Sequence, residues 1–453
     1  MLNLRLSEIA VWTRGHLAGA DVAVHGVATD TRALRGGELF VAFKGEHVDA
    51  HDFLGAAAAA GAAAALVARK VDTPLPQVVV ADTERALGDL AAAVRARRDA
   101  RVIGITGSNG KTTVKTLTAS ILARCGTTHW TQGNLNNEIG LPLTLLALPD
   151  DTRYAVLEMG AGKPGDIAYL AAIARPEVAL VNNVAPAHLE RMHSLAGVAQ
   201  TKGALYEALP DDGIAVINGE DGFAALFTGL AGARRTLRFG FSSLFDVWAD
   251  DLRLGVRSQF LLHTPQGAVD VDLPLAGRHN VSNALAAATI ALALDVPLED
   301  IRLGLEQAGA VAGRLVRRET AAGWTLIDDS YNANPGSAAA AIDTLVLMPG
   351  EPWLVLGDMK ELGADAVVLH ADIGARARAA GVRRLYAPGD LSRAAVQAFG
   401  DGGRHFGAQA ELIDALRADL HAGVCCLVKG SRSSAMDRVV KALLGAQGDS
   451  HAA

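Results

Sequence analysis

The chain has 453 residues, a length that predicts about three domains rather than one large core. Hydrophobic residues make up 50% of it and charged residues 20%, which excludes a disordered chain. The formal net charge is −7, from 42 Lys and Arg against 49 Asp and Glu, and no long basic run occurs, so we expect neither nucleic acid nor an anionic membrane as a partner.

The cysteines and the apolar stretches of the chain argue against a secreted, disulfide-bonded protein and against a membrane protein. The cysteines, Cys125, Cys425 and Cys426, offer no disulfide framework, and we expect buried, inert thiols. Residues 1–8 lack the charged-then-apolar layout of a signal peptide, and the apolar stretches are too short or too interrupted to span a membrane. These features predict a soluble, cytoplasmic protein without membrane insertion.

The first hundred residues alternate short strands with helices. The Ala-rich tract at 56–65 predicts a close-packed helix that ends at Gly61, followed by a strand, rather than a disordered segment. A charged helix then leads into a new apolar strand at 101–105, so we place the end of an N-terminal domain at residue 98. Strands in this domain are predicted at 38–43, 65–68 and 77–81.

The strongest local signal follows the strand at 101–105. Residues 104–114 read Gly-Ile-Thr-Gly-Ser-Asn-Gly-Lys-Thr-Thr-Val and lead into an amphipathic helix, which is the context of a phosphate-binding loop. Lys111 would bridge the β- and γ-phosphates, and Thr112 would offer its hydroxyl to Mg²⁺. Ile105 stands where the strict motif has its first Gly, so a Gly-rich turn without a ligand is the alternative.

Three further residues follow in the next part of the chain. Glu158 ends the apolar strand at 154–157, where a carboxylate can reach a metal beside a phosphate loop. His188 follows the strand at 178–181 and is equally compatible with a metal contact and an ordinary loop histidine. Lys202 lies in a helical stretch, where a lysine is usually a solvated surface residue, so the residue pattern alone does not select it.

Strand, loop and helix alternate over residues 99–313, which predicts a mostly parallel sheet with helices on its faces. A strand at 214–217 precedes a β-ribbon at 245–275. A long helix at 280–294 then places Asn280 and Asn283 on one face of its first turn, where simple N-capping by Asn280 is the alternative to a functional role.

A third α/β unit occupies residues 314–453, with strands at 324–327, 353–356, 384–386 and 424–428. Polar runs follow two of these strands, Asp-Asp-Ser-Tyr-Asn-Ala-Asn-Pro at 328–335 and Lys-Gly-Ser-Arg at 429–432. Polar loops at strand ends suggest a ligand crevice in an open α/β sheet, with ordinary turns as the alternative.

Taken together, these segments resemble the Mur ligase family over essentially the whole chain. The runs at 328–335 and at 356–363 (Leu-Gly-Asp-Met-Lys-Glu-Leu-Gly) favour the member that adds a dipeptide, and the Asp-Asn-Pro-Arg motif of the preceding ligase is absent. The phosphate loop of the family also lacks the first Gly. The other matching segments are 29–32, 37–45, 49–53, 106–113, 133–142, 187–190, 277–280 and 429–432.

The resemblance implies an α/β protein of three domains, with an N-terminal domain (1–98) for the UDP substrate, a central ATP-binding domain (99–313) and a Rossmann-like C-terminal domain (314–453) for the incoming dipeptide. It implies an ATP-dependent ligase, expected as a monomer, that joins D-alanyl-D-alanine to UDP-N-acetylmuramoyl-tripeptide through an acyl phosphate. Closure of the third domain is expected to assemble the site. The alternatives are a Mur ligase that adds a single amino acid, an ATPase or kinase, and a nucleotide-binding regulator.

The resemblance also assigns roles at the nucleotide. Thr112, Glu158 and His188 would hold Mg²⁺, and Lys202 would carry a carbamate. The positions that would bind ATP are Gly107, Ser108, Asn109, Gly110, Lys111, Thr112 and Thr113 of the phosphate loop, with Asn280, Arg314 and Asp329 at adenine, phosphate and ribose.

Further roles concern the other two substrates. Thr31 and Arg32 fall where the family holds the uridine. Asn134 and Asn137 would face the sugar–diphosphate or the catalytic cleft. The positions near the incoming dipeptide would be Asn332, Lys429 and Arg432.

Overall fold

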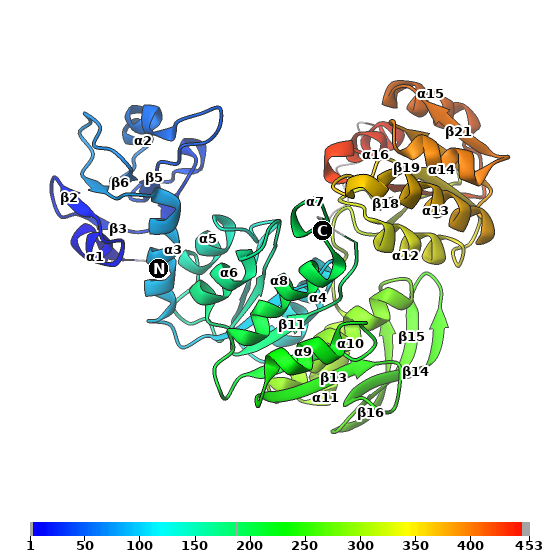
Figure 1. The fold of residues 1–453 in the computed structure, drawn as a ribbon, viewed down its shortest axis with the longest axis horizontal. Helices are drawn as coiled ribbons and strands as arrows, with labels where there is room; N and C mark the ends of the chain where they lie inside the picture. Colours follow the sequence, from blue (N-terminus) through cyan, green and yellow to red (C-terminus); the bar gives the residue numbers. More distant parts are fainter. Residues whose placement is uncertain (1–2, 187–188, 446–453) are drawn as a thin grey trace.

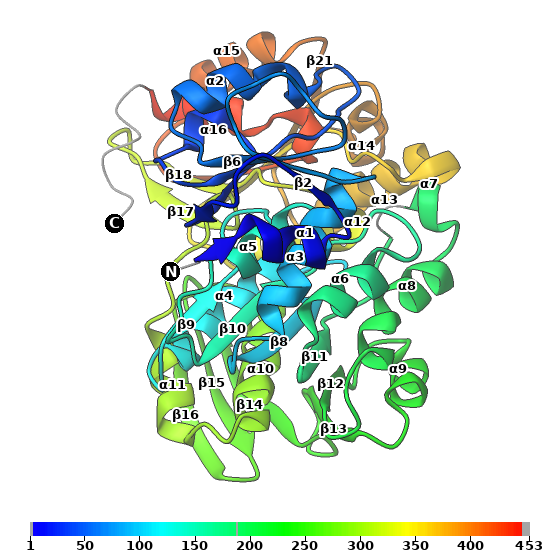
Figure 2. The same cartoon turned by 90° about the vertical axis from the view of Figure 1, so that its left-hand side faces the viewer.

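The computed structural model of the protein describes residues 3–186 and 189–445. These residues form three α/β lobes in chain order, coloured blue, cyan to green, and yellow to red in Figure 1. In both ribbon views the N-terminal and C-terminal lobes lie on the same side of the central lobe (Figure 1, Figure 2). The predicted three-domain α/β architecture is confirmed, whereas the boundaries at residues 98 and 313 stay predictions.

The N-terminal lobe is built on a five-stranded sheet in the order β2-β7-β6-β5-β4, beside a ribbon of β1 and β3. Its strands from β4 to β7 are parallel, and β2 is antiparallel at one edge. The Ala-rich tract forms α2, and Gly61, with a φ of 90°, ends it before β6, as predicted. The elements are β1 (Leu4–Arg5), α1 (Leu6–Trp12), β2 (His16–Ala18), β3 (Ala23–Val24), β4 (Val27–Ala28), the 3-10 helix η1 (Thr31–Ala33), β5 (Leu39–Val41), η2 (Ala50–Phe53), α2 (Leu54–Ala59), β6 (Ala64–Val67), β7 (Gln77–Val79) and α3 (Thr83–Arg95).

The central lobe has a nine-stranded sheet in the order β16-β15-β14-β13-β12-β11-β8-β10-β9. The strands from β9 to β14 are parallel, and β15 and β16 extend the sheet as an antiparallel ribbon. The elements are β8 (Arg101–Thr106), α4 (Lys111–Leu122), β9 (Thr128–Trp130), α5 (Gly140–Leu146), β10 (Tyr154–Glu158), α6 (Asp166–Ala174), β11 (Val178–Val181), α7 (Leu189–Met192), α8 (Leu195–Glu207), β12 (Ile214–Asn218), α9 (Ala224–Ala231), β13 (Arg235–Gly240), β14 (Val247–Leu254), β15 (Ser258–Thr264), β16 (Gly267–Leu273), α10 (Arg278–Ala293) and α11 (Leu298–Glu306).

Neighbouring residues of the central strands face two separate cores, because side chains alternate along a strand. Val102 and Leu157 belong to a core that includes residues of α5, α6, α8 and α9. Ile103 and Val156 belong to a second core, with α4, α10 and α11. Helices therefore cover both faces of the sheet, as predicted.

The core that contains Val102 is shared with the N-terminal lobe. It extends along the chain from Leu4 to Ala231 and includes Leu87 and Leu90 of α3. The C-terminal lobe, in contrast, packs around two cores of its own, one on each face of its sheet. The N-terminal lobe is thus joined to the central lobe by continuous apolar packing. Among the described residues, the C-terminal cores meet the central lobe mainly through the partly buried Ala276.

The C-terminal lobe has a six-stranded sheet in the order β17-β18-β22-β19-β20-β21, parallel except for β17 at one edge. The core residues of α12, α13 and α14 cover one face, and those of α15 and α16 the other. The elements are β17 (Val316–Glu319), β18 (Thr325–Asp329), α12 (Pro335–Leu345), β19 (Glu351–Leu356), η3 (Gly363–Asp365), α13 (Ala366–Ala379), β20 (Arg384–Pro388), α14 (Ser392–Phe399), β21 (Gly403–Phe406), α15 (Gln409–Asp419), β22 (Val424–Lys429), η4 (Arg432–Ser434) and α16 (Asp437–Leu444).

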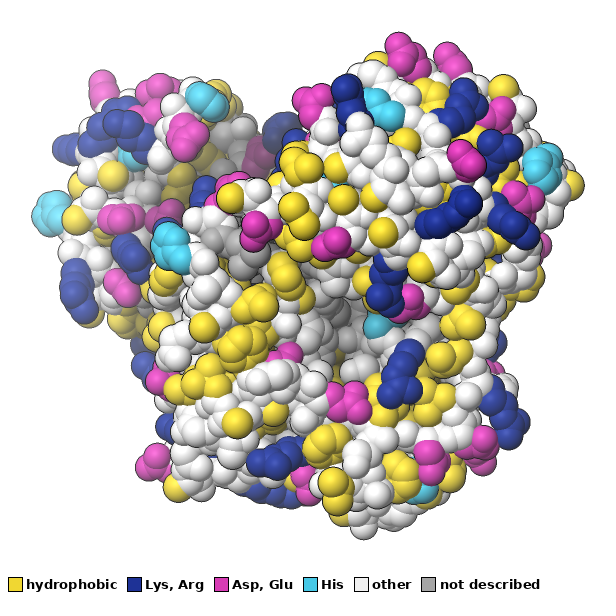
Figure 3. Space-filling view, turned by 45° about the vertical axis from the view of Figure 1, so that its right-hand side comes forward, with side chains coloured by type: hydrophobic (Ala, Val, Ile, Leu, Met, Phe, Trp, Pro, Cys, Tyr) yellow, Lys and Arg dark blue, Asp and Glu magenta, His cyan; other side chains and the backbone are white. Residues whose placement is uncertain are grey.

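The surface of the protein shows no single-sign charge patch on the face drawn in Figure 3, where acidic and basic side chains are interspersed. The same view shows the surface hollowed between the lobes (Figure 3). Within residues 3–186 and 189–445, none of the helices combines the length and the apolar character that crossing a membrane requires.

Candidate active site

A cleft of about 600 Å³ lies between the central and C-terminal lobes. The strand ends of β8 and β10 contribute one wall, and those of β18 and β22 contribute the other. This is the edge at which open α/β sheets bind ligands. Of the predicted site residues, the cleft is lined by Ser108, Asn109, Gly110, Lys111, Thr113, Asn137, Glu158, Asn280, Arg314, Asp329, Asn332 and Lys429.

The phosphate loop joins β8 to α4 by a backbone turn that requires glycine. Gly107 and Gly110 have φ values of 148° and 78°, which side-chain-bearing residues rarely adopt. A Cβ at Gly110 would lie 2.4 Å from Asn283 Oδ1 and 2.6 Å from Asn182 Nδ2. These two asparagines therefore press directly against the loop, and no larger residue fits at Gly110.

The start of α4 supplies donors for an anion. Its first main-chain hydrogen bond runs from Val114 N to Gly110 O, at 2.9 Å. The N–H groups of residues 111–113 consequently have no acceptor within the helix, and the helix dipole favours negative charge at this end. The loop before α4 is held by the segment after β11, because Ser108 N and Asn109 N donate to the backbone oxygen and Oδ1 of Asn183, both at 2.9 Å.

Lys111 and Thr112 make contacts within the protein that a nucleotide would have to replace. Lys111 Nζ donates to Gly107 O at 2.8 Å. Burial lowers the pKa of the Lys111 ammonium, and the Glu158 carboxylate opposes that shift. Arg314 Nη2 donates to Thr112 Oγ1 at 2.9 Å, so the predicted phosphate contact lies beside the predicted magnesium ligand.

Glu158 is a buried carboxylate on the central-lobe wall of the cleft, with an exposed fraction of 2%. Its Oε1 accepts a hydrogen bond from Asn136 Nδ2 at 2.7 Å, and its N–H donates to Thr131 Oγ1 at 2.9 Å. Its Oε2 has no hydrogen-bond partner in the described part of the chain, although Lys115 Nζ lies 3.6 Å away. One carboxylate oxygen is therefore held in place while the other keeps free lone pairs.

Asn136 and Lys115 are not among the residues predicted from sequence. The residues predicted in this part of the chain are Asn134 and Asn137, facing the sugar–diphosphate or the catalytic cleft. Asn137 lines the cleft and accepts from Gly140 N at 2.9 Å, whereas Asn134 is exposed and does not line it. The available signal for Lys115 was its spacing, since it lies four residues after Lys111 and thus on the same face of the helix.

Lys202 lies inside the protein and not on its surface. It projects from α8 with an exposed fraction of 2%, and its Nζ makes no hydrogen bond or ion pair with any residue that the structure describes. Burial, and secondarily the charge of Lys111, holds the pKa of Lys202 well below the usual range of a lysine. The expectation that Lys202, as a lysine in a helix, is a solvated surface residue is wrong.

His188 lies outside the described residues, so its predicted metal contact stays a prediction. Over residues 3–186 and 189–445, no group of three or more His, Cys, Asp or Glu side chains is placed to hold a metal ion. Among the described residues, a cation at this cleft would depend on Glu158 and on hydroxyl oxygens, together with a bound nucleotide.

The first turn of α10 forms a buried amide network behind the phosphate loop. The helix begins after Gly277, so N-capping by Asn280 does not occur. Asn280 Oδ1 accepts from Asn283 Nδ2 at 3.1 Å, and Asn283 Oδ1 accepts from Asn182 Nδ2 at 2.9 Å. Next to them, burial lowers the pKa of His279 to about 4, which leaves a neutral imidazole at the cleft wall.

On the opposite wall, Asp329 and Lys429 end two neighbouring parallel strands and pair with each other. Lys429 Nζ donates to Asp329 Oδ2 at 2.6 Å and to Asn332 O at 3.0 Å. Burial raises the pKa of Asp329, and Lys429 opposes that shift. The charge of Lys429 is thus compensated by Asp329, and its place near the incoming dipeptide stays a prediction.

Tyr331 and Asn334 connect this wall to the nucleotide side. The guanidinium of Arg314 lies 4.4 Å from the centre of the Tyr331 ring, and that of the exposed Arg432 lies 5.9 Å from it. Asn334 Nδ2 donates to Asn109 Oδ1 of the phosphate loop at 2.7 Å. Neither Tyr331 nor Asn334 was selected from sequence, although both stand in the polar run at 328–335.

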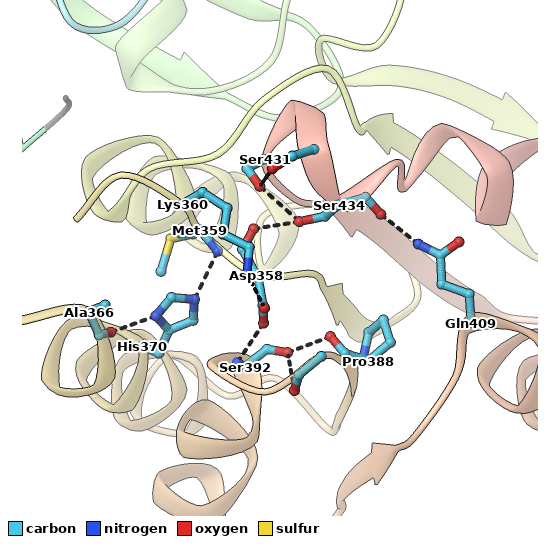
Figure 4. Close-up of polar contacts among 12 residues, drawn as sticks. Asp358, Met359, Lys360, Ala366, His370, Pro388, Ser392, Gln409, Ser431 and Ser434 are labelled. Atoms are coloured by element: carbon cyan, nitrogen blue, oxygen red, sulfur yellow. Dashed lines mark hydrogen bonds and ion pairs between the residues drawn. The ribbon is translucent and has the colours of Figure 1, made fainter. Parts of the chain in front are cut away.

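A second polar network fixes three strand-end loops of the C-terminal lobe (Figure 4). Asp358, just after β19, accepts from Ser392 N at 2.8 Å through its carboxylate. Its backbone oxygen accepts from Ser434 Oγ at 2.7 Å. The loop after β22, which carries Arg432, is thereby tied to those after β19 and β20.

His370 in the same network accepts from Met359 N at 2.9 Å through Nε2, and its Nδ1 lies 2.6 Å from Ala366 O (Figure 4). Burial lowers its pKa, so folding favours the neutral ring. Its contribution to stability is complete above the unfolded pKa of about 6.5 and is lost as the pH falls through the lower folded value.

We expect His370→Gln to flatten the loss of stability of the full-length protein between about pH 7 and pH 5, measured by urea unfolding. An unchanged pH dependence would contradict this role.

Thr31 and Arg32 lie in η1 of the N-terminal lobe and do not line the cleft. The Arg32 side chain is 88% exposed and pairs with Asp30 at 2.5 Å. Hydrogen bonds from Arg32 lower the pKa of Asp30 to about 2. The uridine role of this segment stays a prediction.

Comparison with known protein families finds three matching models. The model for the Mur ligase middle domain matches residues 105–291. That for the Mur ligase glutamate ligase domain matches residues 313–432. That for the Mur ligase family catalytic domain matches residues 23–95.

The chain is also similar to individual proteins along nearly its whole length. It is 47% identical to the UDP-N-acetylmuramoyl-tripeptide–D-alanyl-D-alanine ligase of Escherichia coli (strain K12), covering 98% of this chain and 99% of that protein. A crystal structure of MurF from Acinetobacter baumannii superposes with a TM-score of 0.93 at 37% identity, covering 98% and 99% of the two chains. A MurF ligase from Thermotoga maritima, solved in complex with ADP, has a TM-score of 0.84 at 28% identity, covering 93% and 97%.

Proposed function

The chain belongs to the Mur ligase family, and we propose that it joins D-alanyl-D-alanine to UDP-N-acetylmuramoyl-tripeptide at the expense of ATP. The products are UDP-N-acetylmuramoyl-pentapeptide, a peptidoglycan precursor, with ADP and phosphate. The observation that carries the proposal is the cleft, in which a phosphate loop and a second set of strand-end loops face one volume. A ligase must bring a nucleotide and two other substrates together, and this arrangement supports that.

The reaction has two steps. A carboxylate oxygen of the tripeptide forms a bond to the γ-phosphorus of ATP, and the bond between that phosphorus and the ADP oxygen breaks. The dipeptide amine then attacks the acyl carbon, loses a proton, and phosphate leaves. Lys111 and the N–H groups at the start of α4 would stabilise the charge that spreads over the transferring phosphoryl group.

The donor set fits Mg²⁺, which prefers oxygen ligands. Glu158 Oε2 is a buried carboxylate oxygen that receives no hydrogen bond from the described residues, and such an atom in a native protein calls for an explanation. Glu158 and Thr112 would hold the ion, and His188 remains part of the proposal as a further ligand. When bound, the ion neutralises phosphate charge, while Asn136 keeps the carboxylate oriented.

Lys202 fits the proposed carbamate because it, too, is a buried polar group that calls for a partner. Its amine is buried, lacks a counter-ion in the described part of the protein, and has a lowered pKa. An uncharged amine attacks CO₂ to form an N–C bond while the electron pair of one C=O π bond moves to oxygen. The nitrogen then releases a proton to solvent, which leaves a carbamate anion. That anion would be stabilised by the neighbouring charge of Lys111.

The experiment that tests the function is steady-state ADP release with each substrate omitted in turn. We expect release only when ATP, UDP-N-acetylmuramoyl-tripeptide and D-alanyl-D-alanine are all present. Equal release without the dipeptide would instead favour an ATPase or kinase. Release with a single amino acid in place of the dipeptide would favour another amide ligase of the family.

A further inference from the structure

Lys115 is a second lysine on the helix that leaves the phosphate loop, and the proposed function assigns it no role. It lies one turn beyond Lys111 and has an exposed fraction of 4%. Its Nζ donates to Thr131 O at 2.7 Å and lies 3.6 Å from Glu158 Oε2. Burying an ammonium is costly unless it is paired, so its position beside the Glu158 carboxylate calls for a reason.

Lys115 compensates the charge of Glu158 but donates its hydrogen bond elsewhere, to Thr131 O. At 3.6 Å, the ammonium attracts Glu158 Oε2 but is too far away to form a normal hydrogen bond with it. The lone pairs of that oxygen remain free. The carbonyl oxygen of Thr131 accepts the hydrogen bond that Lys115 Nζ donates, at 2.7 Å.

Thr131 also ties this arrangement to the backbone of the carboxylate. Its Oγ1 accepts from Glu158 N at 2.9 Å, while its carbonyl oxygen accepts from Lys115. Asn136 fixes Oε1 of the carboxylate from the other side. The Glu158 carboxylate is thus held by the amide of Asn136 and the ammonium of Lys115. Its Oε2 receives no hydrogen bond from the described residues.

We propose that Lys115 is a positioning residue that holds Glu158 ready to bind the nucleotide-associated cation without occupying the oxygen that binds it. This inference rests on the proposed function, in which Glu158 holds Mg²⁺. Lys115 would act through Glu158 and would touch neither substrate nor nucleotide; consistent with this, it does not line the cleft.

The test measures ADP affinity of the full-length protein over a range of Mg²⁺ concentrations. Lys115→Met removes the charge and the donor, and Lys115→Gln keeps a donor for Thr131 O. We expect both variants to need about tenfold or more Mg²⁺ for half-maximal ADP binding, the usual effect of removing a partner of a metal ligand. ADP affinity without Mg²⁺ should stay unchanged.

Two further variants make the outcomes distinguishable. Thr118→Val alters the next turn of α4, where Thr118 Oγ1 is buried without a hydrogen bond, and should behave as wild type. Glu158→Gln should lose the Mg²⁺ response. If Glu158→Gln keeps that response, the proposed function of Glu158 fails. If Glu158→Gln loses the response while the Lys115 variants respond to Mg²⁺ as wild type does, the positioning role alone is overturned. The same holds if the Lys115 variants lose ADP affinity equally without Mg²⁺.

Discussion

Replacing Lys111 with methionine is expected to reduce ADP release by about 10²–10³-fold or more, because a preorganised charge on the transferring phosphoryl group is lost. The fold should tolerate the change. Within the described part of the chain, the Lys111 ammonium donates one hydrogen bond, to Gly107 O, and burial already lowers its pKa. Methionine fills a similar volume and does not have to be desolvated. The measurement is steady-state ADP release with all substrates present.

A charge-matched control is available at Lys441 on α16. Its side chain is 77% exposed, and Lys441→Met removes the same charge far from the cleft. Both variants should unfold at the same denaturant concentration as wild type. Normal turnover by Lys111→Met would refute the assignment of the phosphate loop.

Lys202→Ala is expected to lower activity by about 10–100-fold, in the range typical of residues that support a metal site. The truncation also leaves a cavity at a buried position, which a short-chain carboxylic acid could enter to replace the missing anion. We therefore expect acetate or propionate to restore part of the activity of Lys202→Ala and none of that of Lys111→Met.

A direct readout accompanies this rescue experiment. In ¹³CO₂-containing buffer, the wild-type protein should show a carbamate carbon signal that Lys202→Ala lacks. Lys202→Met, which fills the cavity, should lose activity without rescue. Full activity of Lys202→Ala with no carbamate signal in wild type would remove the modification from the mechanism.

Much of the fold could be predicted because strong periodic segments coincide with buried strands. The apolar runs at 101–105, 154–157 and 178–181 became β8, β10 and β11, which are central and fully covered. Short or polar edge strands were missed. Among them, β17 consists of Val-Arg-Arg-Glu, which carries no apolar pattern, and is held by pairing with β18.

The site was only partly predictable because burial and pairing are tertiary properties. The pattern of the run at 133–142 does not say which asparagine turns inward, and in the structure Asn136 reaches Glu158. A helical lysine is usually exposed, so only family resemblance selected Lys202. Lys429 was predicted near the dipeptide, and its pairing could not be read from sequence, because it is the register of β18 and β22 that places it directly against Asp329.

The apolar core shared by the N-terminal and central lobes has a consequence for synthesis of the chain on the ribosome. Because that core extends from Leu4 to Ala231, the first lobe to emerge cannot complete its packing until about half of the chain has been made. The apolar side chains of this lobe that face the shared core are exposed during this interval. The C-terminal lobe, whose cores are self-contained, can fold as soon as its own residues have emerged.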